Sequence, residues 1–493
     1  MRSSRPKQES NCDIVRSAHT ITLGIASVHH MTDSLTSPHA DETRPLDQEN
    51  ADPVEVASSI NETPSAPAET DSHWKRRVTL FLIAQAISLF GSSIVQYAIM
   101  WYLTLTLKTG WVITLYAVVA FVPQAILSLF GGTLADRMNR RTVIAVSDSI
   151  IALVTLGLAI AMIAGETSLW LIYGAVFIRS VGAGFQQPAV GALLPQLTPT
   201  SQLMRVNGIN QTINSAMALL SPVIAGAVYG WGGLVPTFWI DVVTALIGVG
   251  IVLTIPVATV RSGGENEKSF AHDLMDGLRY VAGHRTILWL MVLYTVIFTL
   301  IVAPNFMVPL MIARDFTDAV WPLTVMETSF SAGMALGGLA IATFAVKWNQ
   351  SRMLLYSCGS FGLLSAALGL TPFLGTTVGL FALFVLMFII ALLIPFFSAP
   401  VMTLVQTTVE QTYMGRVFSL INIVAVLGMP IGMIAFGPLA DRFSIQWIFI
   451  ISGIIAFGFT VVSFMAEPGR EVLKMSGQPA TRNPQPATQR DRH

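Results

Sequence analysis

The sequence predicts an all-α membrane protein with twelve transmembrane helices in two pseudo-symmetric six-helix bundles. Its 493 residues are 53% hydrophobic and only 11% charged, whereas charged residues make up about 25% of an ordinary soluble domain. The apolar residues gather in long runs, each near the ~20 residues that a helix needs to cross ~30 Å of hydrocarbon. In addition, short motifs of the first half of the chain recur in the second half.

Twelve apolar segments follow one another after residue 73. They predict helices over residues 78–104, 111–135, 142–164, 168–193, 207–231 and 234–257, and then over 287–313, 322–346, 351–372, 376–398, 417–440 and 444–466. Several segments contain proline, which membrane helices tolerate because neighbouring groups satisfy the freed carbonyls. We expect residues 74–257 and 287–466 to form the two bundles.

Three polar stretches flank the bundles. Residues 1–73 and 467–493 lack apolar periodicity and are rich in polar residues, so we expect two disordered cytoplasmic tails. Residues 258–286 are expected to form a cytoplasmic connector. Within it, apolar residues recur at helical spacing at Phe270, Leu274, Leu278 and Val281. This spacing predicts a short amphipathic helix.

The basic residues predict how the chain is oriented. One side of the membrane would carry sixteen of them: Lys75, Arg76, Arg77, Arg137, Arg140, Arg141, Arg205, Arg261, Lys268, Arg279, Arg285, Lys347, Arg352, Arg416, Arg470 and Lys474. The other side would carry only Lys108, Arg314 and Arg442. Because loops rich in Lys and Arg stay in the cytoplasm, we expect a multi-pass protein of the cytoplasmic membrane with both termini inside.

Two motifs recur in the two halves. Phe185-x-x-Pro188 ends the fourth segment, and Arg205-Val206 follows it. Phe397-x-x-Pro400 ends the tenth segment, and Arg416-Val417 follows it. Recurrence of this kind is typical of a duplicated six-helix unit.

A charged turn separates the second and third segments. Its sequence, Gly132-x-Leu134-Ala135-Asp136-Arg137-x-Asn139-Arg140-Arg141, resembles the signature G-x-L-A-D-R-x-G-R-K/R of the major facilitator superfamily, which joins transmembrane helices 2 and 3. The resemblance implies the major facilitator fold and a conformational-switch loop. The residues of that loop would be Gly132, Asp136, Arg137, Arg140 and Arg141.

The same turn has a simpler interpretation as a cytoplasmic anchor. Asn139 replaces the usual glycine of the signature, and we expect it to reverse the chain, since Asn tolerates left-handed backbone geometry. The hexapeptide Gly437–Arg442 repeats the start of the signature but lacks the basic pair that follows it in the first half.

Charged residues inside the segments need a reason, because each costs ~2.5–3.5 kcal/mol near the bilayer centre. Arg179 lies ~16 Å into the fourth segment, and Asp148 and Asp241 lie ~10 Å deep in the third and sixth. We interpret these three as proton-coupling candidates; the alternative is a structural ion pair or cap. Glu327 lies near the start of its segment, where it could reach water.

Polar side chains follow one face of two first-half segments. Gln85, Ser88, Ser92 and Gln96 recur at spacings of three and four. The remaining candidates for the lining of a substrate cavity are Gln124, Asn210 and Asn214. The alternative is that the stripes only bond adjacent helices, in contacts that average less than ~1 kcal/mol.

The first five segments resemble the macrolide-efflux branch of the drug:proton antiporters. The stretches that carry this resemblance are Gln85 through Ser92, Trp101-Tyr102, Pro123 through Arg141, Ser147-Asp148 and Arg179 through Pro188. The resemblance implies a secondary transporter that exports amphipathic small molecules across the lipid bilayer in exchange for protons. The alternatives are a siderophore or lipid transporter of the same fold, or a membrane scaffold or sensor.

Other function classes are disfavoured. None of the eight His residues lies in an apolar segment, and neither G-x-S-x-G nor H-E-x-x-H occurs, so we expect no enzyme and no catalytic residues. Cys12 and Cys358 are the only cysteines, which leaves no thiolate metal site. We therefore expect no metal and no cofactor. The formal net charge of zero argues against a nucleic-acid partner, and we expect a monomer.

Overall fold

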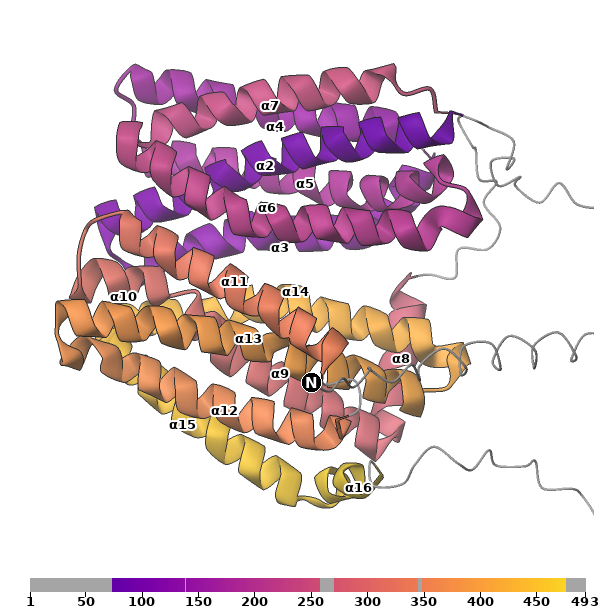
Figure 1. Cartoon of the computed structure of the whole chain (residues 1–493), viewed down its shortest axis with the longest axis vertical. Helices are drawn as coiled ribbons and strands as arrows, with labels where there is room; N and C mark the ends of the chain where they lie inside the picture. Colours follow the sequence, from indigo (N-terminus) through magenta and orange to yellow (C-terminus); the bar gives the residue numbers. More distant parts are fainter. Residues whose placement is uncertain (1–72, 138, 258–269, 345–347, 476–493) are drawn as a thin grey trace, which may run out of the picture. The chain divides into compact units, whose positions relative to one another are not determined.

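The computed structural model describes residues 73–137, 139–257, 270–344 and 348–475. All of them belong to one compact unit that spans residues 65–493. The backbone is helical almost throughout these ranges, which contain no strand. Figure 1 labels the helices along the chain.

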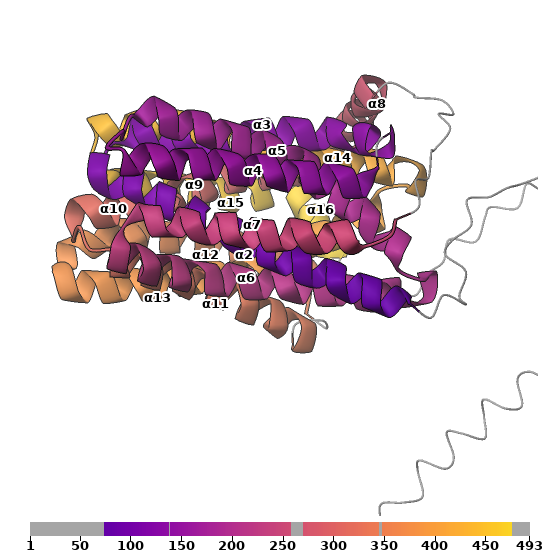
Figure 2. The same cartoon turned by 90° about the horizontal axis from the view of Figure 1, so that it is seen from above.

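Six long helices make up the first half. They are α2 (Trp74–Leu107), α3 (Gly110–Arg137), α4 (Arg140–Ile163), α5 (Leu169–Leu197), α6 (Leu203–Gly232) and α7 (Leu234–Thr254). α2 packs against α6 and α7, while α5 packs against α3 and α4. Figures 1 and 2 show these helices running side by side.

The second half contains six more long helices and three short ones. They are α8 (Phe270–Gly283), α9 (Arg285–Asn305), α10 (Val308–Asp315), α11 (Trp321–Thr343), α12 (Gln350–Leu370), α13 (Thr376–Thr408), α14 (Gln411–Arg442), α15 (Ile445–Met465) and α16 (Glu467–Met475). α11 and α12 pack against α13, and α15 packs against α12 and α9. Between the halves, α14 contacts α3 and α11 contacts α6.

The all-α membrane fold is confirmed. Every one of the twelve predicted segments overlaps a long helix. By length and apolarity, ten helices of the described residues could span a membrane, and an eleventh span is a pair of helices, Met275–Gly283 and Arg285–Leu300, bent by 111°. The criterion therefore supports ten or eleven spans where the sequence predicts twelve.

Two sequence predictions about helix ends were wrong. The segment 287–313 is not one helix, because α9 ends at Asn305 and α10 begins at Val308. Pro309 lies in the first turn of α10, where its missing N–H and its ring prevent a helical bond to the carbonyl of residue 305. The tail predicted from residue 467 begins with α16, in which Val472 is buried.

The two tails otherwise lie outside the described residues, at 1–72 and 476–493. α16 is held to the second half by Ser351, whose Oγ donates a hydrogen bond to the carbonyl of Val472 at 2.8 Å. The amphipathic helix predicted in the connector is present as α8.

Small residues let the helices of the second half approach closely. A Cβ atom on Gly362 of α12 would lie 2.6 Å from the carbonyl oxygen of Gly453 on α15. A Cβ atom on Gly453 would in turn lie 2.5 Å from the backbone nitrogen of Ala366. Membrane helices commonly pack through such positions, since lipid provides no hydrophobic drive for their association.

Candidate functional site

Arg179 and Asp241 form an ion pair inside the first half. Arg179 lies on α5 and Asp241 on α7, and the carboxylate side chain is fully buried. Asp241 also accepts hydrogen bonds from Ser92 Oγ at 3.2 Å and from Thr155 Oγ1 at 2.9 Å. The guanidinium donates to Thr155 Oγ1 and to the carbonyl of Ser92. One network therefore joins α2, α4, α5 and α7.

Asp148 on α4 is a second buried carboxyl group, and neutral donors hold it. Ser88 Oγ donates to its Oδ1 at 3.0 Å, and Gln186 Nε2 donates to the same atom at 2.6 Å. Among the described residues, its Oδ2 has no hydrogen-bond partner although it is buried. Of the two aspartates, the structure pairs Arg179 with Asp241.

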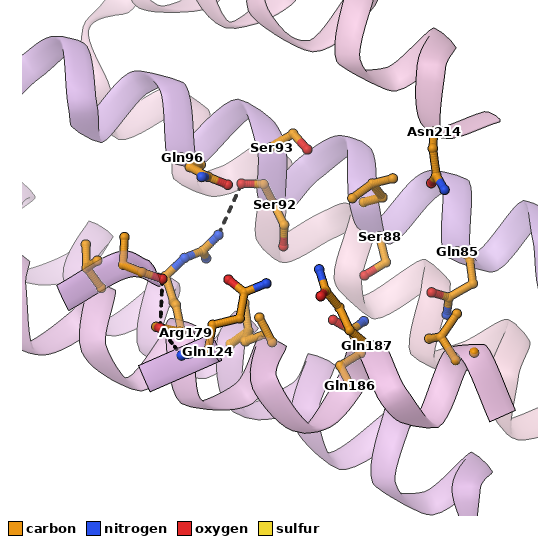
Figure 3. A pocket seen from close by; sticks show the side chains of 18 of the residues that line it. Gln85, Ser88, Ser92, Ser93, Gln96, Gln124, Arg179, Gln186, Gln187 and Asn214 are labelled. Carbon is orange, nitrogen blue, oxygen red and sulfur yellow. Dashed lines mark hydrogen bonds between the residues drawn. The ribbon is translucent and has the colours of Figure 1, made fainter. Parts of the chain in front are cut away.

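A polar cavity lies beside these groups (Figure 3). Its volume is about 430 Å³, and Arg179 contributes to its wall. All seven residues that the sequence suggests for a substrate cavity line it: Gln85, Ser88, Ser92, Gln96, Gln124, Asn210 and Asn214. Nε2 of Gln85 is buried there without a hydrogen-bond partner in the described part of the chain. The seven candidate residues therefore line one cavity. Their binding of substrate stays a prediction.

A larger and mostly apolar cavity adjoins the polar one. Its volume is about 750 Å³, within the range of pockets for drug-sized ligands. Both halves line it: Tyr97 and Phe121 come from the first half, and Tyr294 and Phe397 from the second. Ser93, Gln96, Tyr116, Gln187 and Asn214 line both cavities, as does Leu89. The two cavities are therefore contiguous.

Sequence reasoning missed several residues of this region. Gln186 and Gln187 both line the polar cavity, and Gln186 also bonds to Asp148. Their signal was a pair of amides within an apolar segment, directly before Pro188. Glu327 lines the apolar cavity, although its position near a segment end suggested contact with water.

A cluster around Asp441 joins the two halves at the end of the helices opposite to the 131–141 turn. The Asp441 carboxylate accepts hydrogen bonds from the backbone nitrogens of Gly110 and Trp111, at 2.6 and 2.8 Å. It thereby caps the first turn of α3. Arg314 donates to Asp441 Oδ1 at 2.7 Å and to the carbonyl of Lys108 at 2.7 Å. We call these five residues the Asp441 cluster.

The cluster controls the ionisation of Asp441, which lies just beyond the apolar segment 417–440. Partial burial alone would raise the pKa of this carboxyl group, but the bonds from Gly110, Trp111 and Arg314 outweigh burial and lower the pKa. Asp441 belongs to the hexapeptide Gly437–Arg442, whose repetition in the sequence carried no functional prediction. Asp441 caps the first turn of α3 because that helix end faces it.

The predicted conformational-switch turn is described only in part. α3 continues to Arg137. The side chains of residues 129–138 lie outside the described residues. These include Asp136 and Arg137 as well as the surroundings of Gly132. Arg140 donates to the carbonyl of Ala192 and Arg141 to that of Ile255, both at 2.8 Å. These two arginines therefore bind the backbone ends of α5 and α7. The role of the turn in switching stays a prediction.

Asn139 does not adopt the left-handed conformation expected at this turn. Its φ and ψ angles are −65° and 111°, and its side chain accepts a hydrogen bond from the nitrogen of Arg141. It is the N-cap of α4, a position that Asn favours because its side-chain oxygen satisfies a free backbone donor. Its place between two helices agrees with the sequence prediction.

Comparison with known proteins decides the family. A sequence model of the Major Facilitator Superfamily matches residues 81–433. The chain belongs to the major facilitator superfamily. It is 28% identical over 408 residues to macrolide efflux protein A of Streptococcus pyogenes. The matched residues are 82% of this chain and 99% of that protein. This similarity confirms the resemblance to the macrolide-efflux branch.

Two further similarities are to an efflux pump and to a solved transporter structure. The multidrug efflux pump Tap of Mycolicibacterium fortuitum is 24% identical over 344 residues, which are 66% of this chain and 80% of that pump. Among solved structures, an auto-inhibited peptide transporter of the POT family superposes with a TM-score of 0.64 at 12% identity, covering 84% of this chain and 99% of the other. At that identity the likeness concerns the fold alone.

Proposed function

We propose that this chain exports amphipathic small molecules across the cytoplasmic membrane by proton antiport and alternating access. The observation that supports this most is the junction of two cavities. One is polar and adjoins Arg179, Asp241 and Asp148, and the other is apolar and lies between the halves. A solute site would thus touch the groups that could carry the coupling proton.

The apolar cavity suits an amphipathic solute. Its wall includes Met100, Met217 and Met387 together with several aromatic rings, and methionine side chains adapt to ligands of different shapes. The relatives are named for macrolide and multidrug efflux, which agrees with a large solute. The polar cavity next to it would take the solute's hydroxyl, amide or carbonyl groups.

Asp148 and Asp241 would move the proton in different ways. Asp148 has no basic partner among the described residues, and its buried Oδ2 lacks a hydrogen bond, so an ionised Asp148 would be expensive in this environment. Asp241 shares its charge with Arg179. Protonation of Asp241 would release the guanidinium toward the polar cavity, where it could meet the solute or the Asp148 carboxylate.

Alternating access would use contacts at the two ends of the helices. The Asp441 cluster joins the halves at one end, and from the distribution of basic residues we expect this end to lie outside the cell. The turn that contains Asp136 would join the halves at the cytoplasmic end in the opposite conformer. A single copy would suffice, because one chain lines both cavities.

Efflux assays in cells test this function. A panel of macrolides, dyes and bile-salt-like amphiphiles should include compounds that accumulate less in cells producing the protein, and collapse of the proton gradient should abolish the difference. An iron siderophore and a fluorescent lipid in the same panel test the alternative substrates. Equal accumulation of every compound with and without the protein would refute export.

A further inference from the structure

We propose that the apolar cavity binds amphipathic cations and that the carboxylate of Glu327 is the counter-charge for their positive group. The inference rests on the proposed function, since it names the substrate class of the same site. It concerns a residue outside the network of Arg179, Asp241 and Asp148.

Glu327 stands out by what surrounds it. It lies on α11 and is the one charged side chain among the described residues that line the apolar cavity. The hydrogen bonds and ion pairs of the described chain do not include it, whereas Asp148 has two neutral donors and Asp241 has Arg179. A carboxylate without partners in a mostly apolar wall is costly, and a bound cation would compensate it.

Aromatic rings complete a site for a cation. Phe121 and Phe306 meet edge to face across the two halves, with ring centroids 6.2 Å apart, and both line the cavity. On the second half, Tyr294 stacks on Phe397 with centroids 5.4 Å apart. The faces of such rings attract positive groups, by about 0.5–2 kcal/mol for each contact.

The charges of the cavity favour a cation over an anion. Arg179 is already paired with the buried Asp241, and it lines the polar cavity rather than the apolar one. An anionic amphiphile would bring its charge against Glu327, and the described residues of the cavity wall include no basic side chain to receive it. A neutral amphiphile would fill the apolar volume but leave Glu327 uncompensated.

A binding assay with a charged and an uncharged aromatic compound tests the site. The purified full chain in detergent is titrated with tetraphenylphosphonium, a permanent cation, and with triphenylphosphine oxide, which is neutral. The Glu327→Gln variant should bind the cation at least ~10-fold more weakly, equivalent to about 1.4 kcal/mol, while its affinity for the neutral compound stays within about threefold.

Two further variants separate charge from folding. Glu327→Asp keeps the negative charge and should retain preference for the cation. Glu166→Gln removes a carboxylate from an exposed loop position and should bind both compounds as the unaltered chain does. Equal binding of the cation by Glu327→Gln, or an equal loss of both compounds, would overturn the proposal.

Transport of the same two compounds distinguishes this inference from the proposed function. If vesicles that contain the unaltered chain move the cation but Glu327→Gln moves it equally well, export stands and the Glu327 site is refuted. If the unaltered chain binds the cation in a Glu327-dependent way but moves neither compound, the Glu327 site stands and export of this cation is refuted.

Discussion

Arg179 of α5 and Asp241 of α7 form an ion pair in which the aspartate is fully buried and the arginine borders the polar cavity. One partner is thus fixed by packing, while the other is positioned to respond to what enters the cavity. Ser92 and Thr155 complete the hydrogen bonding of the carboxylate, so the pair is part of the packing of four helices as well as of the cavity wall.

Removal of one partner of this pair should destabilise the protein more than removal of both. Arg179→Gln leaves the Asp241 charge buried without its partner, which we expect to lower the free energy of unfolding by about 3–5 kcal/mol. The double variant Arg179→Gln/Asp241→Asn should recover more than half of that loss. Thermal unfolding in detergent measures the difference, and a double variant less stable than either single one would contradict the prediction.

Asp148→Asn should uncouple transport without blocking the solute path. The amide keeps an oxygen that can accept from Ser88 and Gln186 but cannot take up the proton. In proteoliposomes we expect exchange of labelled for unlabelled substrate within about threefold of the unaltered rate, while uphill accumulation driven by a pH gradient falls by about 100-fold, as for loss of an essential proton acceptor. Retained accumulation would exclude Asp148 as the proton carrier.

Gly437→Ala should weaken the contact between α3 and α14. The added Cβ atom would lie 1.5 Å from Thr114 Oγ1, so the two helices must separate. Ala440, which is buried beside this contact, reports the change after replacement by Cys in a chain whose natural cysteines are replaced by Ser. We expect maleimide to label this position several-fold faster in the Gly437→Ala variant.

Two controls accompany that labelling experiment. Gly458→Ala places a Cβ where no atom lies within 4 Å, so labelling should not change. Thr114→Ala removes the closest oxygen but leaves Cβ of residue 114 at 2.8 Å from the added atom, so it should restore slow labelling only in part when it is combined with Gly437→Ala. An unchanged rate in the single variant would show that the contact does not hold the helices together.

The Asp441 cluster should be insensitive to mild acidification. Because the pKa of Asp441 in the folded protein lies below its ordinary value, the stabilisation from its charge is fully present above that ordinary value of about 4 and is lost only as the pH falls through the lowered pKa. Because maleimide reacts with the thiolate, the rate at position 440 is divided at each pH by that of a free thiol, and this ratio should be flat from neutral pH to about pH 5. Asp441→Asn should raise labelling across that whole range.

With the Asp441 cluster intact, faster labelling of position 440, relative to the free thiol, at about pH 5 than at neutral pH would contradict the lowered pKa of Asp441. Arg314→Gln offers a second test, because it removes the donors to Asp441 and to the Lys108 carbonyl together. It should raise labelling at least as much as Asp441→Asn does.

Much of the fold and of the polar cavity could be predicted from the sequence. The period of Gln85, Ser88, Ser92 and Gln96 matches one face of a helix, and those four side chains line one cavity. Arg179 was singled out by the cost of a charge deep in an apolar segment, and it lies in an ion pair. Both inferences needed only the positions within a single helix.

Features that join different helices could not be predicted in this way. The partner of Arg179 depends on how α4, α5 and α7 are rotated about their axes, which sequence spacing does not fix. Asp441 is informative only because the first turn of α3 lies opposite to it. Glu327 lines the apolar cavity because α11 packs across the halves on α6. Its place near the start of its own segment had suggested contact with water instead.

The most direct test of proton antiport is the release of protons when substrate binds. The purified chain in weakly buffered detergent should acidify the solution when a transported amphiphile is added, and Asp148→Asn or Asp241→Asn should abolish the signal while substrate still binds. Acidification that persists in both variants, or none in the unaltered chain at saturating substrate, would contradict the coupling of these carboxylates to solute.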